Sequence, residues 1–193
     1  MSDYVITNRK YKSIQDIVDS FGESGVKIDL GCGYVKPRGF IGIDYLLGES
    51  AQIPDLENAP DIVMDINNCS IPFGDNTCVE VRASHFLEHS DADRIINETY
   101  RVLKQKGVFM FAVPYANSAE GMYPGHHFFF TEKWFYENIN FQNKFQIIKE
   151  EYFPSSEYLK LPFIIRMIIP FKIARIFLFN ACRQMILQCE ARK

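Results

Sequence analysis

The sequence predicts an α/β fold, in which a mostly parallel sheet is covered by helices on both faces. Short segments rich in β-branched and aromatic residues recur along the chain, with polar or helical stretches between them. They occupy residues 26–30, 40–44, 61–66, 78–84, 108–114, 145–153 and 184–192. Strands that alternate with helices in this way form a mostly parallel sheet.

Three segments have the signals of helices. Residues 13–21 (SIQDIVDSF) place their apolar side chains on one face. Residues 91–104 follow Ser90, a good N-cap, and stop before Gly107. A third helix is expected to start at Thr131, in TEKWFYENI.

Composition and charge narrow the class of protein. The chain has 193 residues, 47% of them apolar, which fits one domain over residues 1–193. A formal charge of −3 gives no general attraction to nucleic acid, so we expect no such partner.

Five cysteines without C-x-x-C spacing argue for free thiols, and the N-terminus lacks an apolar export segment. A cytoplasmic location is therefore expected.

A glycine-rich turn ends the first buried strand. In the segment Asp29–Gly33 (DLGCG), two glycines let the main chain come close to a ligand. Open α/β sheets bind nucleotides at such a turn. Asp44 ends the next strand, where a carboxylate can accept hydrogen bonds from both hydroxyls of a ribose. Asp65, followed by Ile66, ends the strand after that.

Two kinds of cofactor compete for this turn. A dinucleotide site needs G-x-G-x-x-G opening a helix, whose N-terminus holds the pyrophosphate. Here Lys36 stands at the third glycine position with Pro37 beside it, and no helix fits before Phe40. The sequence therefore excludes a standard dinucleotide site and favours S-adenosylmethionine, which has no pyrophosphate.

Five segments then occur in a characteristic order. They are VKIDLGCG, GFIGID, DIVMDI–IPF, VRASHFLEH and LKQKGVFMFAVP, within roughly residues 26–153. This series resembles the class I S-adenosylmethionine-dependent methyltransferases, closest to their type 11 branch. The resemblance implies a doubly wound, Rossmann-like sheet of seven strands, with the last strand (about 184–192) antiparallel and inserted near the edge.

The resemblance also implies which residues hold S-adenosylmethionine. They are Asp29, Gly31, Cys32 and Gly33 along the methionine part, Asp44 at the ribose, Asp65 and Ile66 beside the adenine, and Ala83 and Ser84 beneath the sulfonium.

The first crossover departs from the family pattern. Asp29 and Asp44 are 15 positions apart, whereas parallel neighbours normally need a crossover of about a dozen residues or more, usually a helix. The segment YVKPRG is too short for a helix and must be a loop, with residues 34–39 exposed. Some members with this shortened segment are tied to cell-surface sugar assembly, and the chain resembles those.

All four histidines follow the fourth and fifth strands, next to the expected position of the cofactor's methyl group. Methyl transfer requires positioning and removal of a proton, and histidine has a suitable pKa. We predict His85 and His89 as catalytic residues and Tyr115, His126 and His127 as substrate contacts. The alternative for each histidine is a hydrogen bond to loop backbone.

The segment HFLEH (85–89) also spells the H-x-x-E-H pattern of zinc proteases. It straddles a strand end and a loop, and no clear third ligand follows, so we assign no metal ligand. A zinc-dependent hydrolase using His85 and His89 stays open as an alternative, as does a non-catalytic scaffold of the same fold.

An apolar, basic insert is expected at about residues 154–183. Residues 1–157 hold 14 Lys and Arg against 23 Asp and Glu, whereas residues 158–183 hold five basic residues and no acid. Pro162 and Pro170 and several charges interrupt the apolar run, so it does not span a bilayer. Two short helices hinged at Pro170 are expected, forming a sheet cap, a dimer face or a peripheral contact with an anionic membrane.

By these criteria the sequence predicts methyl transfer from S-adenosylmethionine to a hydroxyl or amine of a small molecule or glycan.

Overall fold

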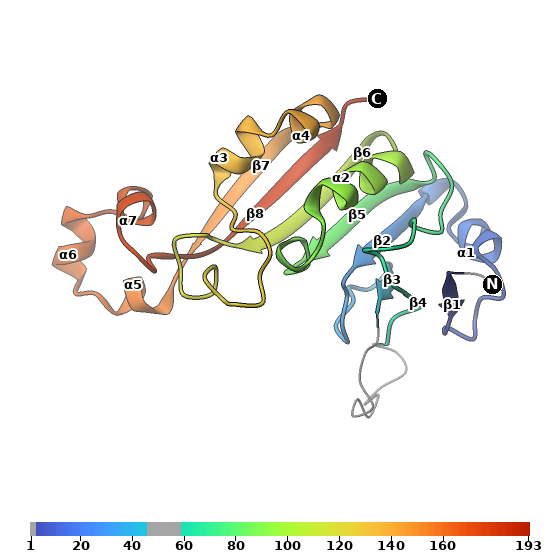
Figure 1. The fold of residues 1–193 in the computed structure, drawn as a ribbon, viewed down its shortest axis with the longest axis horizontal. Helices are drawn as coiled ribbons and strands as arrows, with labels where there is room; N and C mark the ends of the chain where they lie inside the picture. Colours follow the sequence, from blue (N-terminus) through green and yellow to red (C-terminus); the bar gives the residue numbers. More distant parts are fainter. Residues whose placement is uncertain (1–2, 46–58) are drawn as a thin grey trace.

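The strands lie in the order β1-β4-β3-β2-β5-β6-β8-β7 across one sheet (Figure 1). The computed structural model describes residues 3–45 and 59–193. Its strands are β1 (Tyr4–Ile6), β2 (Val26–Leu30), β3 (Ile41–Asp44), β4 (Ile62–Met64), β5 (Cys78–Ser84), β6 (Leu103–Pro114), β7 (Phe145–Pro154) and β8 (Cys182–Ala191). Strands β2 to β6 pair in parallel, and β8 runs antiparallel between β6 and β7, as predicted. The α/β fold class is confirmed.

The described part of the sheet has eight strands rather than the seven predicted. The additional strand, β1, pairs antiparallel with β4 at one edge. Its three residues, YVI, form a shorter run than the roughly four or more residues that mark a strand in a sequence, and Val5 is 62% exposed.

The helices agree with the expected segments except at their ends. They are α1 (Ile14–Phe21), α2 (Ala92–Val102), α3 (Glu132–Glu137), α4 (Ile139–Lys144), α5 (Ser156–Lys160), α6 (Phe163–Ile168) and α7 (Phe171–Phe177), with short 3₁₀ helices η1 (Gly22–Ser24) and η2 (Leu87–His89). The N-cap of α2 is Asp91, not Ser90, because the Ser90 hydroxyl donates instead to the carbonyl of Leu87. The helix predicted from Thr131 is divided in two by Asn138.

Aromatic side chains form much of the core between the sheet and α3 and α4. Phe109 and Phe111 of β6 contact Phe135, Phe141 and Phe145, and all five are at most 1% exposed. Such rings bury large apolar areas, so this cluster fixes the two helices on the sheet.

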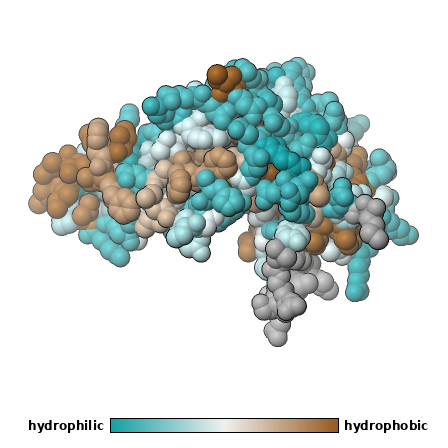
Figure 2. All heavy atoms as spheres, in the orientation of Figure 1, coloured by the Kyte–Doolittle hydropathy of each residue, from teal (hydrophilic) through white to brown (hydrophobic). Residues whose placement is uncertain are grey.

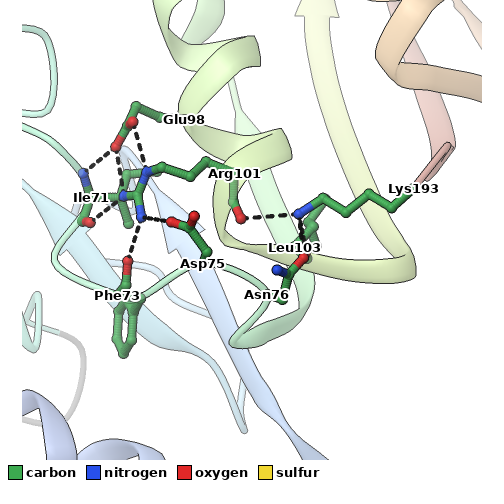
Figure 3. Close-up of polar contacts among 8 residues, drawn as sticks. All are labelled: Ile71, Phe73, Asp75, Asn76, Glu98, Arg101, Leu103 and Lys193. Atoms are coloured by element: carbon green, nitrogen blue, oxygen red, sulfur yellow. Dashed lines mark hydrogen bonds and ion pairs between the residues drawn. The ribbon is translucent and has the colours of Figure 1, made fainter.

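Arg101, on α2, holds the segment between β4 and β5. Its guanidinium donates to the carbonyls of Ile71 and Phe73 and pairs with Glu98 and Asp75 (Figure 3). Planar guanidinium groups suit several acceptors at once, so one side chain anchors this long connection to the helix.

A buried ion pair takes the place of the missing crossover helix. Lys36, in the loop after β2, reaches Asp61 just before β4 with 2.7 Å between Nζ and Oδ1. Asp61 is 2% exposed and also accepts a hydrogen bond from the backbone N–H of Gly42 in β3 at 2.8 Å. The shortened loop is therefore tied to the two strands beside it.

The insert projects from the end of the sheet at which β7 ends and β8 begins (Figure 1). It contains three helices, α5 to α7, rather than two, because Pro162 as well as Pro170 interrupts the chain. Figure 2 shows hydrophobic side chains gathered at this end of the molecule. None of the helices in the described residues has the length and apolar character needed to span a bilayer.

We expect Lys36→Met to lower the free energy of unfolding by about 3–5 kcal/mol, because it leaves the buried Asp61 carboxylate without a cation. Lys27→Met is the matched control, since Lys27 pairs with Glu80 at 42% side-chain exposure and should cost no more than about 1 kcal/mol. Urea denaturation followed by circular dichroism measures both. Equal losses in the two variants would contradict the anchoring role of Lys36.

Candidate active site

The turn after β2 has the geometry of a ligand-binding loop. Gly31 and Gly33 adopt φ values of 65° and 53°, in the left-handed region that favours glycine. A Cβ atom on Gly31 would lie 2.4 Å from the ring of Phe86, whereas one on Gly33 would meet nothing within 4 Å. Gly31 is therefore required by packing, and the backbone at Gly33 borders open space.

Asp44 closes this turn. Its Oδ2 accepts a hydrogen bond from the Gly33 N–H at 2.6 Å, and its Oδ1 accepts one from the N–H of Tyr45. The parallel pairing of β2 and β3 brings the two carboxyl ends together, as the sequence predicted. The predicted ribose acid and the glycine turn thus form one unit.

Asp29 lies under the turn rather than at its surface. It is fully buried, and its two oxygens lie 2.9 and 2.8 Å from one guanidinium nitrogen of Arg82 on β5. Burial raises the pKa of Asp29 to about 6, while the neighbouring Arg82 acts in the opposite direction. In this arrangement the carboxylate fixes Arg82 directly.

Three other predicted cofactor residues turn inward or brace the backbone. The Cys32 thiol is 7% exposed and faces Gly42. Ile66 is 3% exposed and packs in the core. Asp65 accepts hydrogen bonds from the Asn67 N–H and the Asn68 amide, which shapes the turn after β4.

A cavity of about 330 Å³ opens where β5 and β6 end. It is lined by His85, Glu88, His89, Pro114, Glu120, Tyr123, His126 and Arg183. A second cavity of about 250 Å³ adjoins it at His85 and reaches Arg82, Ala83 and Ser84 on β5. The predicted sulfonium position and the predicted catalytic histidines are therefore neighbours.

His85 is held between two side chains. Its Nδ1 lies 3.4 Å from the Glu88 carboxylate and its Nε2 lies 3.0 Å from Oε1 of Gln184. The neighbouring Glu88 carboxylate raises the pKa of His85; burial opposes this effect and Gln184 adds to it. The residue has a φ of 52°, so the strand ends abruptly and the imidazole turns toward the cavity.

The predicted substrate residues are not all at the cavity. His126 lines it, whereas His127 is exposed and contributes its backbone N–H to the Glu88 carbonyl. Tyr115 is 4% exposed and donates its hydroxyl to Glu132, which also pairs with Arg175 of the insert. Tyr115 therefore supports the insert instead of lining the cavity.

Several lining residues were missed in the sequence. Glu120 and Tyr123 come from the loop after β6, and Arg183 comes from β8. Arg183 pairs with Glu120 at 3.1 Å. Nothing in their local sequence marks them, because the fold alone brings these segments to the ends of β5 and β6.

Comparison with known proteins gives a family and a fold. The family model described as "Methyltransferase domain", of type 11, matches residues 28–111. No curated protein matches the chain in sequence at a significant level.

Solved structures share the fold over most of the chain. A SAM-dependent methyltransferase from Archaeoglobus fulgidus aligns with a TM-score of 0.63 and 16% identity, covering 92% of this chain and 90% of that one. A putative S-adenosylmethionine-dependent methyltransferase from Listeria monocytogenes aligns with a TM-score of 0.56 and 16% identity, covering 88% and 90%. The [4+2]-cyclase SpnF aligns with a TM-score of 0.56 and 19% identity, covering 98% and 86%. The predicted resemblance and its cofactor, S-adenosylmethionine, are supported by the family match, and the fold by these structures.

We expect Asp44→Ala to weaken S-adenosylmethionine binding about tenfold to hundredfold, the equivalent of one or two charge-assisted hydrogen bonds. The change removes the predicted ribose acceptor and releases Gly33. Isothermal titration measures the dissociation constant, with Asp3→Ala as a control at an exposed acid. Equal affinity in the two variants would show that Asp44 does not hold the ribose.

Proposed function

We propose that this protein, whose residues 28–111 match the type 11 methyltransferase domain model, methylates a hydroxyl or amine of a small molecule or glycan. The observation that carries the proposal is the cavity with ionisable side chains in its lining at the ends of β5 and β6, next to the predicted position of the sulfonium. Both hydrogen-bond donors and hydrogen-bond acceptors line this cavity, as a hydroxylated or amino acceptor requires. The shortened crossover favours an acceptor from cell-surface polysaccharide biosynthesis, by its resemblance to members with that feature.

His85 serves as the general base in this proposal. The acceptor's proton passes to His85 while a bond forms from the acceptor oxygen or nitrogen to the methyl carbon and the sulfur–carbon bond breaks. S-adenosylhomocysteine leaves as the other product. Glu88, on one side of the imidazole, orients it and stabilises the imidazolium that forms. His89 and His126 also line the cavity and face the space proposed for the acceptor.

The first test is cofactor binding. Isothermal titration should show S-adenosylmethionine binding to the wild-type chain, and the absence of binding at near-millimolar cofactor would overturn the proposal in favour of a non-catalytic scaffold.

Loss of the proposed base in His85→Ala should reduce methyl transfer about 10²- to 10⁴-fold while S-adenosylmethionine affinity stays nearly unchanged. His89→Ala, which changes the wall of the cavity, should also reduce methyl transfer without changing that affinity. Release of S-adenosylhomocysteine with a panel of sugar and amine acceptors measures the rate. Lys133→Ala, at a side chain 74% exposed and outside the cavity, is the control. Unchanged turnover in both histidine variants would assign these residues to structure only.

We also propose that the insert rests on an anionic membrane surface. On α6, Phe163, Ile164, Met167 and Ile168 are 66–73% exposed. Lys160 and Lys172 flank this helix and are exposed as well, and residues 158–183 hold no acid. Exposed apolar side chains next to cations suit the interface of an anionic bilayer.

Co-sedimentation with liposomes tests this contact. We expect pelleting with anionic vesicles, little with neutral ones, and loss of pelleting in Ile168→Glu. Ile139→Glu is the matched control, since Ile139 is 75% exposed on α4. No pelleting, together with a dimer that Ile168→Glu dissociates, would identify the insert as a dimer face instead.

A further inference from the structure

Three side chains in the cavity have the composition of a metal site. Ligand atoms of Glu88, His89 and His126 all lie within 4.8 Å of one another. Two residues of this set belong to the HFLEH segment, and the fold supplies a third from the loop after β6. The sequence pattern had no clear third ligand because His126 follows His89 by 37 positions.

The Glu88 carboxylate is buried without adequate partners. Glu88 is 1% exposed, and neither of its oxygens accepts a hydrogen bond within the part of the chain that the structure describes. Among residues 3–45 and 59–193, the one ion pair of Glu88 is with His85 Nδ1 at 3.4 Å. Burial of a carboxylate is costly unless it is paired, hydrogen-bonded or bound to a metal.

Both histidines of the cluster are oriented by backbone carbonyls. Nδ1 of His89 lies 3.2 Å from the Gly125 carbonyl, and Nδ1 of His126 lies 3.2 Å from the Gly121 carbonyl. The Nδ1–H groups therefore donate to the backbone, and each Nε2 keeps its lone pair. Metal-binding histidines are held in the same manner, by a hydrogen bond from the other ring nitrogen. The two rings lie 4.6 Å apart, centroid to centroid.

We propose that Glu88, His89 and His126 bind a divalent transition-metal ion. Two imidazoles and one carboxylate are ligands that suit Zn²⁺ and Fe²⁺, whereas Mg²⁺ prefers oxygen ligands. Donor atoms up to 4.8 Å apart must close by about 1 Å or more to give bonds near 2.1 Å, a movement that side-chain rotation supplies.

Three protein ligands leave at least one coordination position open. All three line the cavity, so that position faces the space proposed for the acceptor. A hydroxyl bound there would have a lowered pKa and would release its proton to His85 more readily. This role in the reaction rests on the proposed function, whereas binding of the metal does not.

Titration of the chelator-treated protein with Zn²⁺ tests the site, with Co²⁺ as a spectroscopic probe of the ligands. We expect one ion per chain. Glu88→Gln, His89→Ala and His126→Ala should each weaken binding by more than about tenfold, since loss of even an outer-shell partner commonly has that effect. His127→Ala is the matched control, because this exposed histidine is adjacent in sequence and outside the cluster.

Absence of Zn²⁺ and Co²⁺ binding to the wild type would overturn the metal site, as would unchanged affinity in all three variants. Weakening in His127→Ala equal to that in His126→Ala would equally overturn it, by showing non-specific binding. Titration of each variant with S-adenosylmethionine keeps the two proposals apart. A chain that binds S-adenosylmethionine but no metal retains the proposed function, and one that binds metal but no S-adenosylmethionine retains only the site.

Discussion

The ion pair between Lys36 and Asp61 is the constraint on which the cofactor end of the sheet depends. A parallel crossover normally uses a helix to return the chain, and its packing on the sheet then fixes the two strands. Here the loop is too short for a helix, and one buried cation replaces that packing. The Asp61 carboxylate also accepts a hydrogen bond from the Gly42 N–H in β3, and the Asp61 backbone carbonyl accepts one from the Thr7 N–H after β1. One residue therefore sets the relative positions of β1, β3, β4 and the loop that leads from the glycine turn.

Charged pairs on one face of the sheet accompany the shortened crossover. Lys27 pairs there with Glu80, and Asp29 with Arg82, at adjacent cross-strand positions of β2 and β5. Alternation along the strands places these four side chains on one face and the apolar Val26, Ile28 and Leu30 on the other. An apolar row would need a helix to bury it, whereas charged pairs tolerate partial exposure. The polar row and the short loop are thus consistent adaptations to the same missing element.

Much of this architecture was predictable, because it depends on local patterns. The strand segments, α1, the glycine turn and the juxtaposition of Gly33 with Asp44 follow from hydrophobic runs and from the parallel order of the strands. What escaped prediction depends on distant contacts. Residues 4–6 form the strand β1 because they pair with β4 at the edge of the sheet. Arg183 reaches the cavity because β8 pairs with β6. Tyr115 was predicted to contact the substrate, yet its neighbours in the structure are Glu132 of α3 and Arg175 of the insert.

The histidines show how the same residues acquire different roles from their surroundings. His85 and His89 are four positions apart, and both were predicted from the sequence as catalytic residues. In the structure His85 has both ring nitrogens next to side chains, Glu88 and Gln184, so its protonation responds to groups within the cavity. His89 has one nitrogen fixed by a backbone carbonyl, which sets its tautomer and leaves the other nitrogen as an electron-pair donor. A histidine that acts as a general base must take up and release a proton. A histidine that binds a metal ion must have no proton on the ring nitrogen that donates its electron pair to the metal. In our proposals these contacts make His85 the proton acceptor and His89 the ligand, with the carboxylate of Glu88 near both.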